Sequence, residues 1–193
     1  MTIFIGNNDT ENLTGSTGDD QINGNGGNDI LIGDSGNDTL NGGLGNDSMQ
    51  GNAGADTYLI AKADNQDIIY NWDADNSVDT VKFTNLPSTG ITAVFGLNND
   101  LVLQYGSGGQ LTINNYFYTD ANYRIDKFQF TDKEWTLAQL ASQHKGTVNA
   151  DSLIGFNGVV NIITALDGND SLYGGDQNDT LNCRKSSVTR RCQ

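Results

Sequence analysis

The sequence predicts an all-β protein in which a parallel β-roll (β-solenoid) of nonapeptide repeats flanks a β-rich central segment. Three observations support this fold class: a nine-residue repeat fills residues 15–59, apolar residues alternate in the middle of the chain, and the repeat returns after residue 145. A nine-residue period matches neither the stripe of an amphipathic helix nor the alternation of a strand. It fits one turn followed by one short strand of a solenoid.

The amino-terminal repeat runs five times without interruption and reads Gly-x-x-Gly-x-Asp-x-apolar-x. Two glycines at fixed offsets specify one tight loop in each unit, because glycine adopts positive φ without steric cost. The preceding residues 6–14 keep the register loosely and are predicted to cap residues 1–59, the first domain. The apolar eighth position is expected to point into the roll: Ile22, Leu31, Leu40, Met49 and Tyr58.

The conserved spacing of the acidic side chains within the repeat predicts a metal site. Successive loops alternate between the two edges of a roll, so aspartates eighteen residues apart are expected to stack. Ca²⁺ is a hard cation that takes about six to eight oxygen ligands, and glycine loops leave backbone carbonyls free to complete the set. Five loops then give three sites. The predicted ligands are Asp20, Asp29, Asp38, Asp47 and Asp56 with the loops of Gly15, Gly18, Gly24, Gly27, Gly33, Gly36, Gly42 and Gly45.

The energetics of one repeat predict that this cation is needed for folding. Ordering nine residues costs more conformational entropy than one buried apolar side chain returns. Stacked carboxylates on one edge also repel each other. We therefore expect the roll to be largely disordered without Ca²⁺ and to fold as the ion binds.

Composition narrows the classes of partner. The 193 residues carry a formal net charge of −14, and only two of the 24 acids, Glu11 and Glu134, are glutamates. Such a negatively charged surface disfavours the binding of nucleic acid, because it would repel the phosphate backbone. No apolar run reaches the length of a membrane span, and the first ten residues lack a Sec-type signal. Cysteine occurs only at Cys183 and Cys192, so no disulfide framework is expected in the body of the chain.

The middle of the chain, residues 60–145, is predicted to form a second, β-rich domain that supplies the main hydrophobic core. Alternating apolar residues predict strands around residues 81–83, 101–105, 111–113 and 128–130, with turns at 98–100 and 106–109. A short helix is predicted from Thr136 to Ser142.

Residues 146–182 form a second, eroded repeat block. Its second unit has Val160 where the aspartate belongs, and Thr164 is interpreted as one inserted residue. Asp170 and Asp179 are weaker candidate metal ligands, expected on opposite edges of the roll. The tail, residues 183–193, is basic and is assigned no function.

The five repeats resemble the haemolysin-type calcium-binding, or repeats-in-toxin (RTX), nonapeptide of exported bacterial proteins. Residues 54–83, 99–117 and 122–140 are similar to the haemolysin-type calcium-binding-protein-related domain that interrupts such arrays. The resemblance implies a parallel β-roll, secretion to the extracellular space through type I secretion machinery, and calcium-triggered folding outside the cell.

An enzyme is not expected. The single histidine, His144, excludes an HExxH zinc helix, and neither a GxSxG elbow nor a GxxxxGK[ST] loop occurs. His144 is interpreted as a solvated loop residue. The segment from Asp73 to Ser77 begins like an EF-hand but lacks its glycine and closing glutamate, and is interpreted as a turn that supports calcium binding with Asp79.

An alternative function is a calcium-stiffened adhesion or surface-layer module that binds a glycan or a protein. Exposure of the aromatic run at residues 116–118 would favour this alternative, although such clusters in β-segments more often belong to the core.

Overall fold

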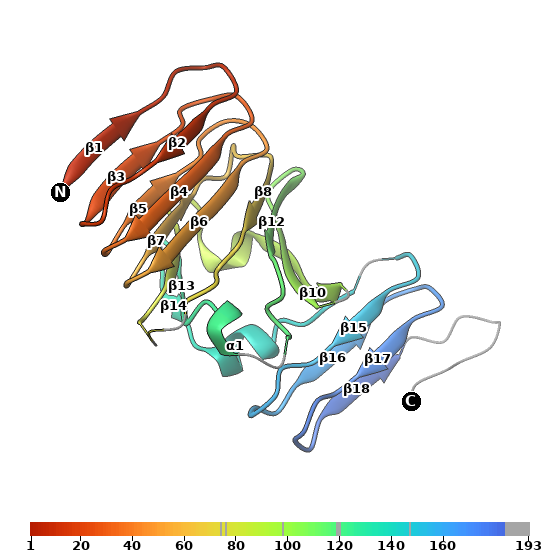
Figure 1. Ribbon diagram of the computed structural model, residues 1–193. Helices are drawn as coiled ribbons and strands as arrows, with labels where there is room; N and C mark the ends of the chain where they lie inside the picture. The colour runs from red at the N-terminus through yellow and green to blue at the C-terminus, as the bar shows by residue number, and fades with distance from the viewer. Residues whose placement is uncertain (74, 76, 98, 119–120, 147, 184–193) are drawn as a thin grey trace.

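The computed structural model describes residues 1–73, 75, 77–97, 99–118, 121–146 and 148–183. Two sheets of parallel strands face each other across the amino-terminal roll, and the chain alternates between them from coil to coil (Figure 1). The first sheet contains, in spatial order, β1 (Thr2–Ile5), β3 (Asp20–Asn23), β5 (Thr39–Asn41), β7 (Thr57–Ile60), β9 (Thr80–Phe83), β13 (Lys127–Gln129) and β14 (Glu134–Trp135).

The second sheet carries the alternate strand of each coil. It contains, in spatial order, β10 (Ile91–Leu97), β11 (Asp100–Tyr105), β12 (Gly109–Ile113), β8 (Gln66–Ile69), β6 (Ser48–Ala53), β4 (Ile30–Ser35) and β2 (Asn12–Thr14). Within the repeats, paired residues in neighbouring strands are eighteen positions apart, as the nine-residue period predicts. The all-β roll predicted from the sequence is confirmed.

One apolar side chain per nine-residue repeat points between the two sheets. The five eighth-position residues of the repeats are at most 1% exposed, which confirms the predicted inward direction. The largest of them, Tyr58, still satisfies its hydroxyl: it donates to Oδ1 of Asn71 (2.8 Å) and accepts from the backbone N–H of Gly51 (2.9 Å). We call the coils of residues 2–83 the first roll.

The central segment, residues 60–145, continues the two sheets of the first roll and shares strands β8 and β9 with it. Strand β8 pairs in parallel with β6, β9 pairs with β7, and β12 and β13 add further parallel strands. Antiparallel pairing begins only with β10, β11 and β14. Aromatic side chains fill the core here, with Phe83 stacked on Phe130 at 4.8 Å and Phe130 against Trp135 at 4.5 Å between ring centroids.

The predicted helix is present as α1 (Leu137–Ala141). Thr136 caps its amino terminus, where its hydroxyl accepts from the backbone of Gln139 and the Gln139 side chain accepts from the Thr136 backbone. This reciprocal capping box explains why so short a helix forms. Two 3₁₀ turns, η1 (Ser88–Gly90) and η2 (Ala121–Tyr123), complete the central segment.

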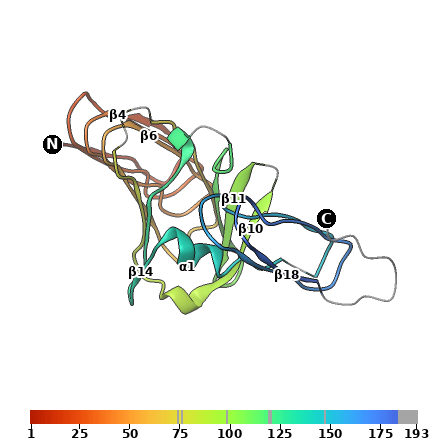
Figure 2. The ribbon, with the colours of Figure 1, turned by 90° about the horizontal axis from the view of Figure 1, so that it is seen from below.

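The second repeat block folds into a short roll of its own, which we call the second roll. It pairs β15 (Ser152–Ile154) with β17 (Ser171–Tyr173), and β16 (Ile162–Ala165) with β18 (Thr180–Cys183). Its buried residues pack against β10 and β11 rather than against the first roll: Leu153, Ile163, Ala165 and Leu172 contact Ala93, Phe95 and Val102. Figure 2 shows β10 and β11 between the two rolls.

The predicted register of the second block was wrong at one point. Asn161, not Val160, occupies the aspartate position, because its N–H bonds to Asp179 one coil later (2.8 Å). Thr164 is no insertion, since it lies within β16 and pairs with Asn182. The extra residue lies instead in the loop before Asn161, where extra length does not disturb strand pairing.

Residues 184–193, most of the predicted basic tail, lie outside the described residues. In the part of the chain that the structure describes, no helix has the length and apolar character that crossing a membrane requires.

Candidate metal centre

The predicted aspartates form two hydrogen-bonded columns along the roll. In the first column, Oδ1 of Asp38 accepts from the backbone N–H of Asp20, and Oδ1 of Asp56 accepts from that of Asp38, both at 2.8 Å. In the second column, Oδ1 of Asp47 accepts from the N–H of Asp29 at the same distance. The predicted eighteen-residue stacking is therefore confirmed.

The second carboxylate oxygen of these aspartates has no hydrogen-bond partner. Oδ2 is buried and unpartnered in four of them: Asp29, Asp38, Asp47 and Asp56. Asp20, at the outer end of its column, differs because its Oδ2 accepts from the N–H of Ser16 (2.5 Å) and from its hydroxyl (2.8 Å). Leaving a buried carboxylate oxygen without a donor is costly, and a cation would remove that cost.

Glycine at the first position of the repeat keeps the space beside this oxygen open. A Cβ on Gly24 would collide with Oδ2 of Asp29 and lie 2.6 Å from the carbonyl oxygen of Gly42, one coil later. Gly33 stands in the same relation to Asp38 and to the carbonyl of Gly51. The carboxylate oxygen and the carbonyl oxygen thus border the same small volume, a combination that suits a hard cation.

The fourth-position glycines make the turn. Gly27, Gly36, Gly45 and Gly54 have φ between 110° and 138°, a region that other residues rarely adopt. A Cβ on Gly36 would also meet the backbone of Gly18 in the neighbouring coil. Gly18 itself has open space around it because its loop is the outermost one on this edge.

Both columns extend beyond the repeats. Oδ1 of Asp67 accepts from the N–H of Asp47 (3.0 Å), and Oδ1 of Asp79 accepts from that of Asp56 (2.9 Å). Asp126 continues the first column by accepting from the N–H of Asp79 (3.0 Å). At the other end, Glu11 donates its N–H to Asp29 (2.8 Å) and so begins the second column.

The nine-residue period did not reveal these added members. Their spacings from the preceding aspartate are 20, 23 and 47 residues instead of 18. The sequence predicts Asp79 only as a supporting residue, and the pattern does not single out Asp67 or Asp126. A shorter signal could have found all three, because each keeps the aspartate-x-apolar part of the repeat, ending at Ile69, Val81 and Phe128.

In the ion-free protein, burial makes it unfavourable for most of the column aspartates to be ionised, and this raises their pKa values. Burial raises the pKa of Asp56 to about 8, and repulsion from Asp79 adds to this effect. Burial, together with repulsion from Asp47, likewise raises the pKa of Asp67 to about 8. The pKa values of Asp29, Asp38 and Asp47 are also raised, chiefly by burial. A bound cation would hold these carboxylates in their charged form.

Side chains alone do not surround a metal position. Within the described ranges, no three His, Cys, Asp or Glu side chains converge on one point. An ion in the columns therefore needs backbone carbonyls in addition to carboxylates, which is the ligand set expected from glycine loops.

In the second roll the two predicted acids are separated. Asp170 stacks with Asp151, whose N–H it accepts (3.0 Å), whereas Asp179 stacks with Asn161 on the other edge. The Asn161 amide donates to Oδ1 of Asp179 (2.9 Å) and also lies 2.7 Å from the carbonyl oxygen of Gly174. Amide hydrogens thus stand beside Asp179 in the place where a cation would otherwise be needed.

At the turn predicted for residues 73–77, two hydrogen bonds link Asp73, Asp75 and Ser77. Oδ1 of Asp73 accepts from the N–H of Asp75 (2.9 Å), and Oδ1 of Asp75 accepts from that of Ser77 (2.8 Å). Residues 74 and 76 lie outside the described residues.

The interpretation of His144 as a solvated residue was wrong. The side chain is 1% exposed, and its Nε2 accepts from the N–H of Gly96 (3.3 Å). Its Nδ1 is buried without a hydrogen-bond partner. Burial lowers the pKa of His144 to about 4, so the ring is neutral at physiological pH. It packs against Phe156, at the junction between the central segment and the second roll.

Comparison with known protein families agrees with this geometry. Residues 5–40, 32–59 and 157–182 match the family described as RTX calcium-binding nonapeptide repeat (4 copies). Residues 100–139 match the haemolysin-type calcium binding protein related domain. The two matches cover the nonapeptide repeats of the first roll, most of the second roll and part of the central segment.

Two individual proteins are also similar. The iron-regulated protein FrpA of Neisseria meningitidis serogroup C is 33% identical over 134 residues, which are 65% of this chain and 10% of FrpA. The chain thus spans about a tenth of that relative. The solution structure of the AlgE6R3 subunit of the Azotobacter vinelandii mannuronan C5-epimerase matches 56% of this chain and 70% of its own, with 26% identity and a TM-score of 0.41. That score is too low to show a shared overall fold.

Proposed function

Since the chain belongs to the RTX haemolysin-type calcium-binding family and binds Ca²⁺, we propose that its ions lie between successive carboxylates of the two columns. The unpartnered, buried Oδ2 atoms of Asp29, Asp38, Asp47 and Asp56 are the observation that supports this placement. Each ion would take one such oxygen and glycine-loop carbonyls. The proposed ligands include Asp20 and the loops of the first- and fourth-position glycines, Gly15 to Gly45, as predicted from the sequence.

The structural extension of the columns adds further positions to this proposal. Asp67 follows Asp47, and Asp79 follows Asp56, with the same N–H to Oδ1 bond that links the repeats. Ions beside Asp47 and Asp56 would then have a carboxylate on each side. In the second roll, Asp151 with Asp170 remains a proposed pair, whereas Asp179 is the weakest candidate because Asn161 already donates to it.

We further propose that Ca²⁺ binding drives folding of the first roll. Without an ion, the fold must either bury several negative charges or protonate them, and both states are unfavourable near pH 7. With the ion, the carboxylates and carbonyls become ligands, so binding free energy becomes folding free energy. The roll acts in this proposal by binding and by stiffening the chain, with no catalytic step of its own.

The proposed setting is the extracellular space after export by a type I secretion system. This part rests on the family, whose members are typically secreted, and on the high free Ca²⁺ available outside cells. A chain that stays unfolded in low Ca²⁺ and folds in high Ca²⁺ is suited to passage through a narrow exporter.

Far-ultraviolet circular dichroism tests calcium-coupled folding directly. The chain is titrated from chelator to about 10 mM CaCl₂, a range that spans the affinities of extracellular modules, with MgCl₂ as the control. A cooperative gain of β signal with Ca²⁺ alone is expected. A spectrum that is already fully β in chelator would show that the ions are not needed for folding.

A second candidate function, adhesion to a glycan or protein, loses part of its sequence argument. In the aromatic run at 116–118, Tyr116 is 3% exposed and Phe117 packs partly against the core, so only Tyr118 is well exposed. The candidate keeps support from a cavity at the junction with the second roll, which Tyr116 and Phe117 line together with Phe156 and Tyr173.

A further inference from the structure

A cavity of about 110 Å³ opens where the second roll meets the central segment. Three aromatic rings form its apolar wall: the centroids of Tyr116 and Phe156 are 5.8 Å apart, and those of Phe117 and Phe156 are 5.0 Å apart. The hydroxyl of Tyr116 donates to the carbonyl of Ile125 (3.3 Å), which fixes the ring. Cavities at the junction of two structural units are common ligand sites.

Arg124 supplies the cation at this cavity. Its backbone is held in place, since its carbonyl accepts from the amide of Asn71 (2.9 Å). Its guanidinium forms no ion pair with any residue that the structure describes. In a chain of net charge −14 with only ten lysines and arginines, an arginine that lines an aromatic cavity is a candidate partner for an external anion.

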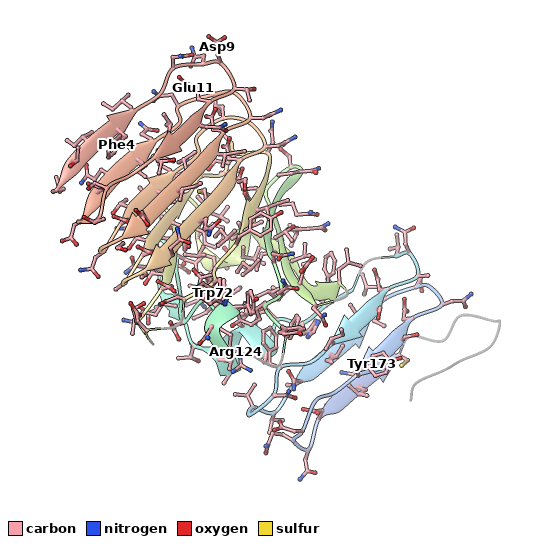
Figure 3. All side chains as sticks on the ribbon, viewed as in Figure 1. Phe4, Asp9, Glu11, Trp72, Arg124 and Tyr173 are labelled. Carbon is pink, nitrogen blue, oxygen red and sulfur yellow. The ribbon has the colours of Figure 1, made fainter. Side chains whose placement is uncertain are left out.

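The second roll supplies further residues to the lining besides Phe156. Tyr173, on β17, lines the cavity and is 51% exposed, and Asn157 adds a polar amide. Figure 3 shows Arg124 beside α1 and Tyr173 on β17 of the second roll. The cavity therefore exists only when the second roll is docked on the central segment.

We propose that this cavity binds a carboxylated sugar, with the carboxylate on Arg124 and the pyranose ring against Phe117 and Tyr173, the two lining aromatic side chains that are not fully buried. Guanidinium and carboxylate form paired, charge-assisted hydrogen bonds. The C–H groups on one face of a pyranose carry partial positive charge and pack on the electron-rich faces of aromatic rings. The amide of Asn157 can bond to ring hydroxyls.

Other ligand classes fit the cavity less well. A neutral sugar would leave the guanidinium of Arg124 without an anion. A phosphate-rich or sulfate-rich polymer would meet one arginine and a strongly negative protein, so its long-range electrostatic interaction would be repulsive. An aromatic acid would satisfy the arginine and the rings but would leave the polar wall at Asn157 without a partner.

Titration of the full, calcium-loaded chain tests this proposal with three probes: glucuronate, glucose and benzoate. Binding is followed by calorimetry and by tryptophan fluorescence. Trp72 is a suitable reporter because it is 51% exposed and its neighbour Asn71 donates its side-chain amide to the carbonyl of Arg124 (2.9 Å). Saturable binding of glucuronate, at least about tenfold tighter than that of glucose or benzoate, is expected.

Variants assign the binding to the cavity. Arg124→Gln is expected to weaken glucuronate binding by about tenfold or more, whereas Lys82→Gln, which removes one exposed positive charge from β9, leaves it unchanged. Tyr173→Ala is expected to weaken it by about threefold to tenfold through lost ring contact. Because both altered residues lie at the cavity rim, circular dichroism should show an unchanged fold.

Three results would overturn the proposal: equal binding of glucose, binding of benzoate as tight as that of glucuronate, or no saturable binding of any probe. The same titrations in chelator separate this inference from the calcium proposal. Folding without Ca²⁺ would contradict calcium-coupled folding alone, and loss of glucuronate binding in a folded Arg124→Gln variant would still support the cavity.

Discussion

The two rolls share a fold but differ in how deeply they bury their acidic side chains. In the first roll the column aspartates are at most 2% exposed, and four of them have an unpartnered oxygen. In the second roll Asp151, Asp170 and Asp179 are only half-buried, and an asparagine amide faces Asp179. The nine-residue repeat therefore forms a roll whether its acids are fully buried or half-buried. The demand for a cation comes from the depth of burial of the acid columns.

The rolls also differ in their apolar support. The inward residues of the first roll, one per strand, belong to the same core as the aromatic residues of the central segment. The second roll packs Leu153, Ile163 and Leu172 against residues of β10 and β11. Both rolls therefore have apolar contact with the central segment, and we expect the first roll to depend more on an ion because its acid columns are fully buried.

Removal of Ca²⁺ should produce the largest difference between the rolls. In chelator, amide hydrogen exchange in β4, β5 and β6 is expected to accelerate by about a hundredfold or more, because local opening no longer costs ligand binding. Exchange in β16 and β18 should change much less. Mass-spectrometric exchange with and without Ca²⁺ measures both, and parallel loss of protection in the two rolls would contradict the comparison.

The second largest difference is expected from substitutions of single column acids, which should change the Ca²⁺ requirement for folding in the first roll more than in the second. Asp38→Asn alters the acid between Asp20 and Asp56 and so affects two proposed ion positions. The Ca²⁺ concentration at half-folding is expected to rise about tenfold or more, since affinity follows ligand charge. Asp179→Asn should shift it by less than about twofold. A large shift for Asp179→Asn would place an essential ion in the second roll.

A pair of glycine substitutions tests the open space beside Oδ2. A Cβ at Gly33 would collide with Oδ2 of Asp38 and lie 2.7 Å from the carbonyl of Gly51. Gly33→Ala is therefore expected to lower both Ca²⁺ affinity and stability. Gly158 in the second roll has φ of 80° but nothing within 4 Å of a Cβ.

Gly158→Ala is accordingly expected to cost only backbone strain, about 1–2 kcal/mol, with unchanged Ca²⁺ affinity. Thermal unfolding at several Ca²⁺ concentrations distinguishes the two effects. Equal Ca²⁺ dependence in the two variants would show that the first-position glycine does not border an ion.

The sequence was sufficient where a strict period reports a repeated geometry. The stacking of Asp20, Asp38 and Asp56 follows from a spacing of eighteen residues alone, as does the inward direction of Leu40. It was insufficient where loops of irregular length interrupt the period. Asp67 and Asp79 reach the columns through insertions, and only the folded backbone shows that these insertions loop out while the strand register is kept.

The same limit explains the errors in the second roll and at His144. An extra residue before Asn161 can be absorbed at several points of a loop, and the sequence does not say which. Burial of His144 results from docking of the second roll on the central segment, and docking between units leaves no periodic signal. Polar residues buried at such junctions are therefore difficult to identify from sequence.

The smallest predicted difference is a response to pH of opposite sign in the two regions. In the ion-free first roll, Asp56 has a pKa raised to about 8, so the folded state binds a proton more tightly than the unfolded chain does. This contribution to stability is complete below the ordinary pKa of 3.8 and is lost as pH rises toward about 8. Lowering the pH in chelator should therefore promote residual structure in the first roll.

At the junction with the second roll the sign reverses, because the pKa of His144 is lowered to about 4 from its ordinary 6.5. Its contribution to stability is complete above about 6.5 and is lost as pH falls toward about 4. Hydrogen exchange is measured in chelator at pH 7 and pH 5, with exchange times corrected for the pH dependence of the intrinsic rates. On lowering the pH from 7 to 5, protection should increase in β5 and β7 and decrease in β10. His144→Gln should abolish the change in β10 only. If β10 instead keeps the same pH response in that variant, another group at the junction titrates.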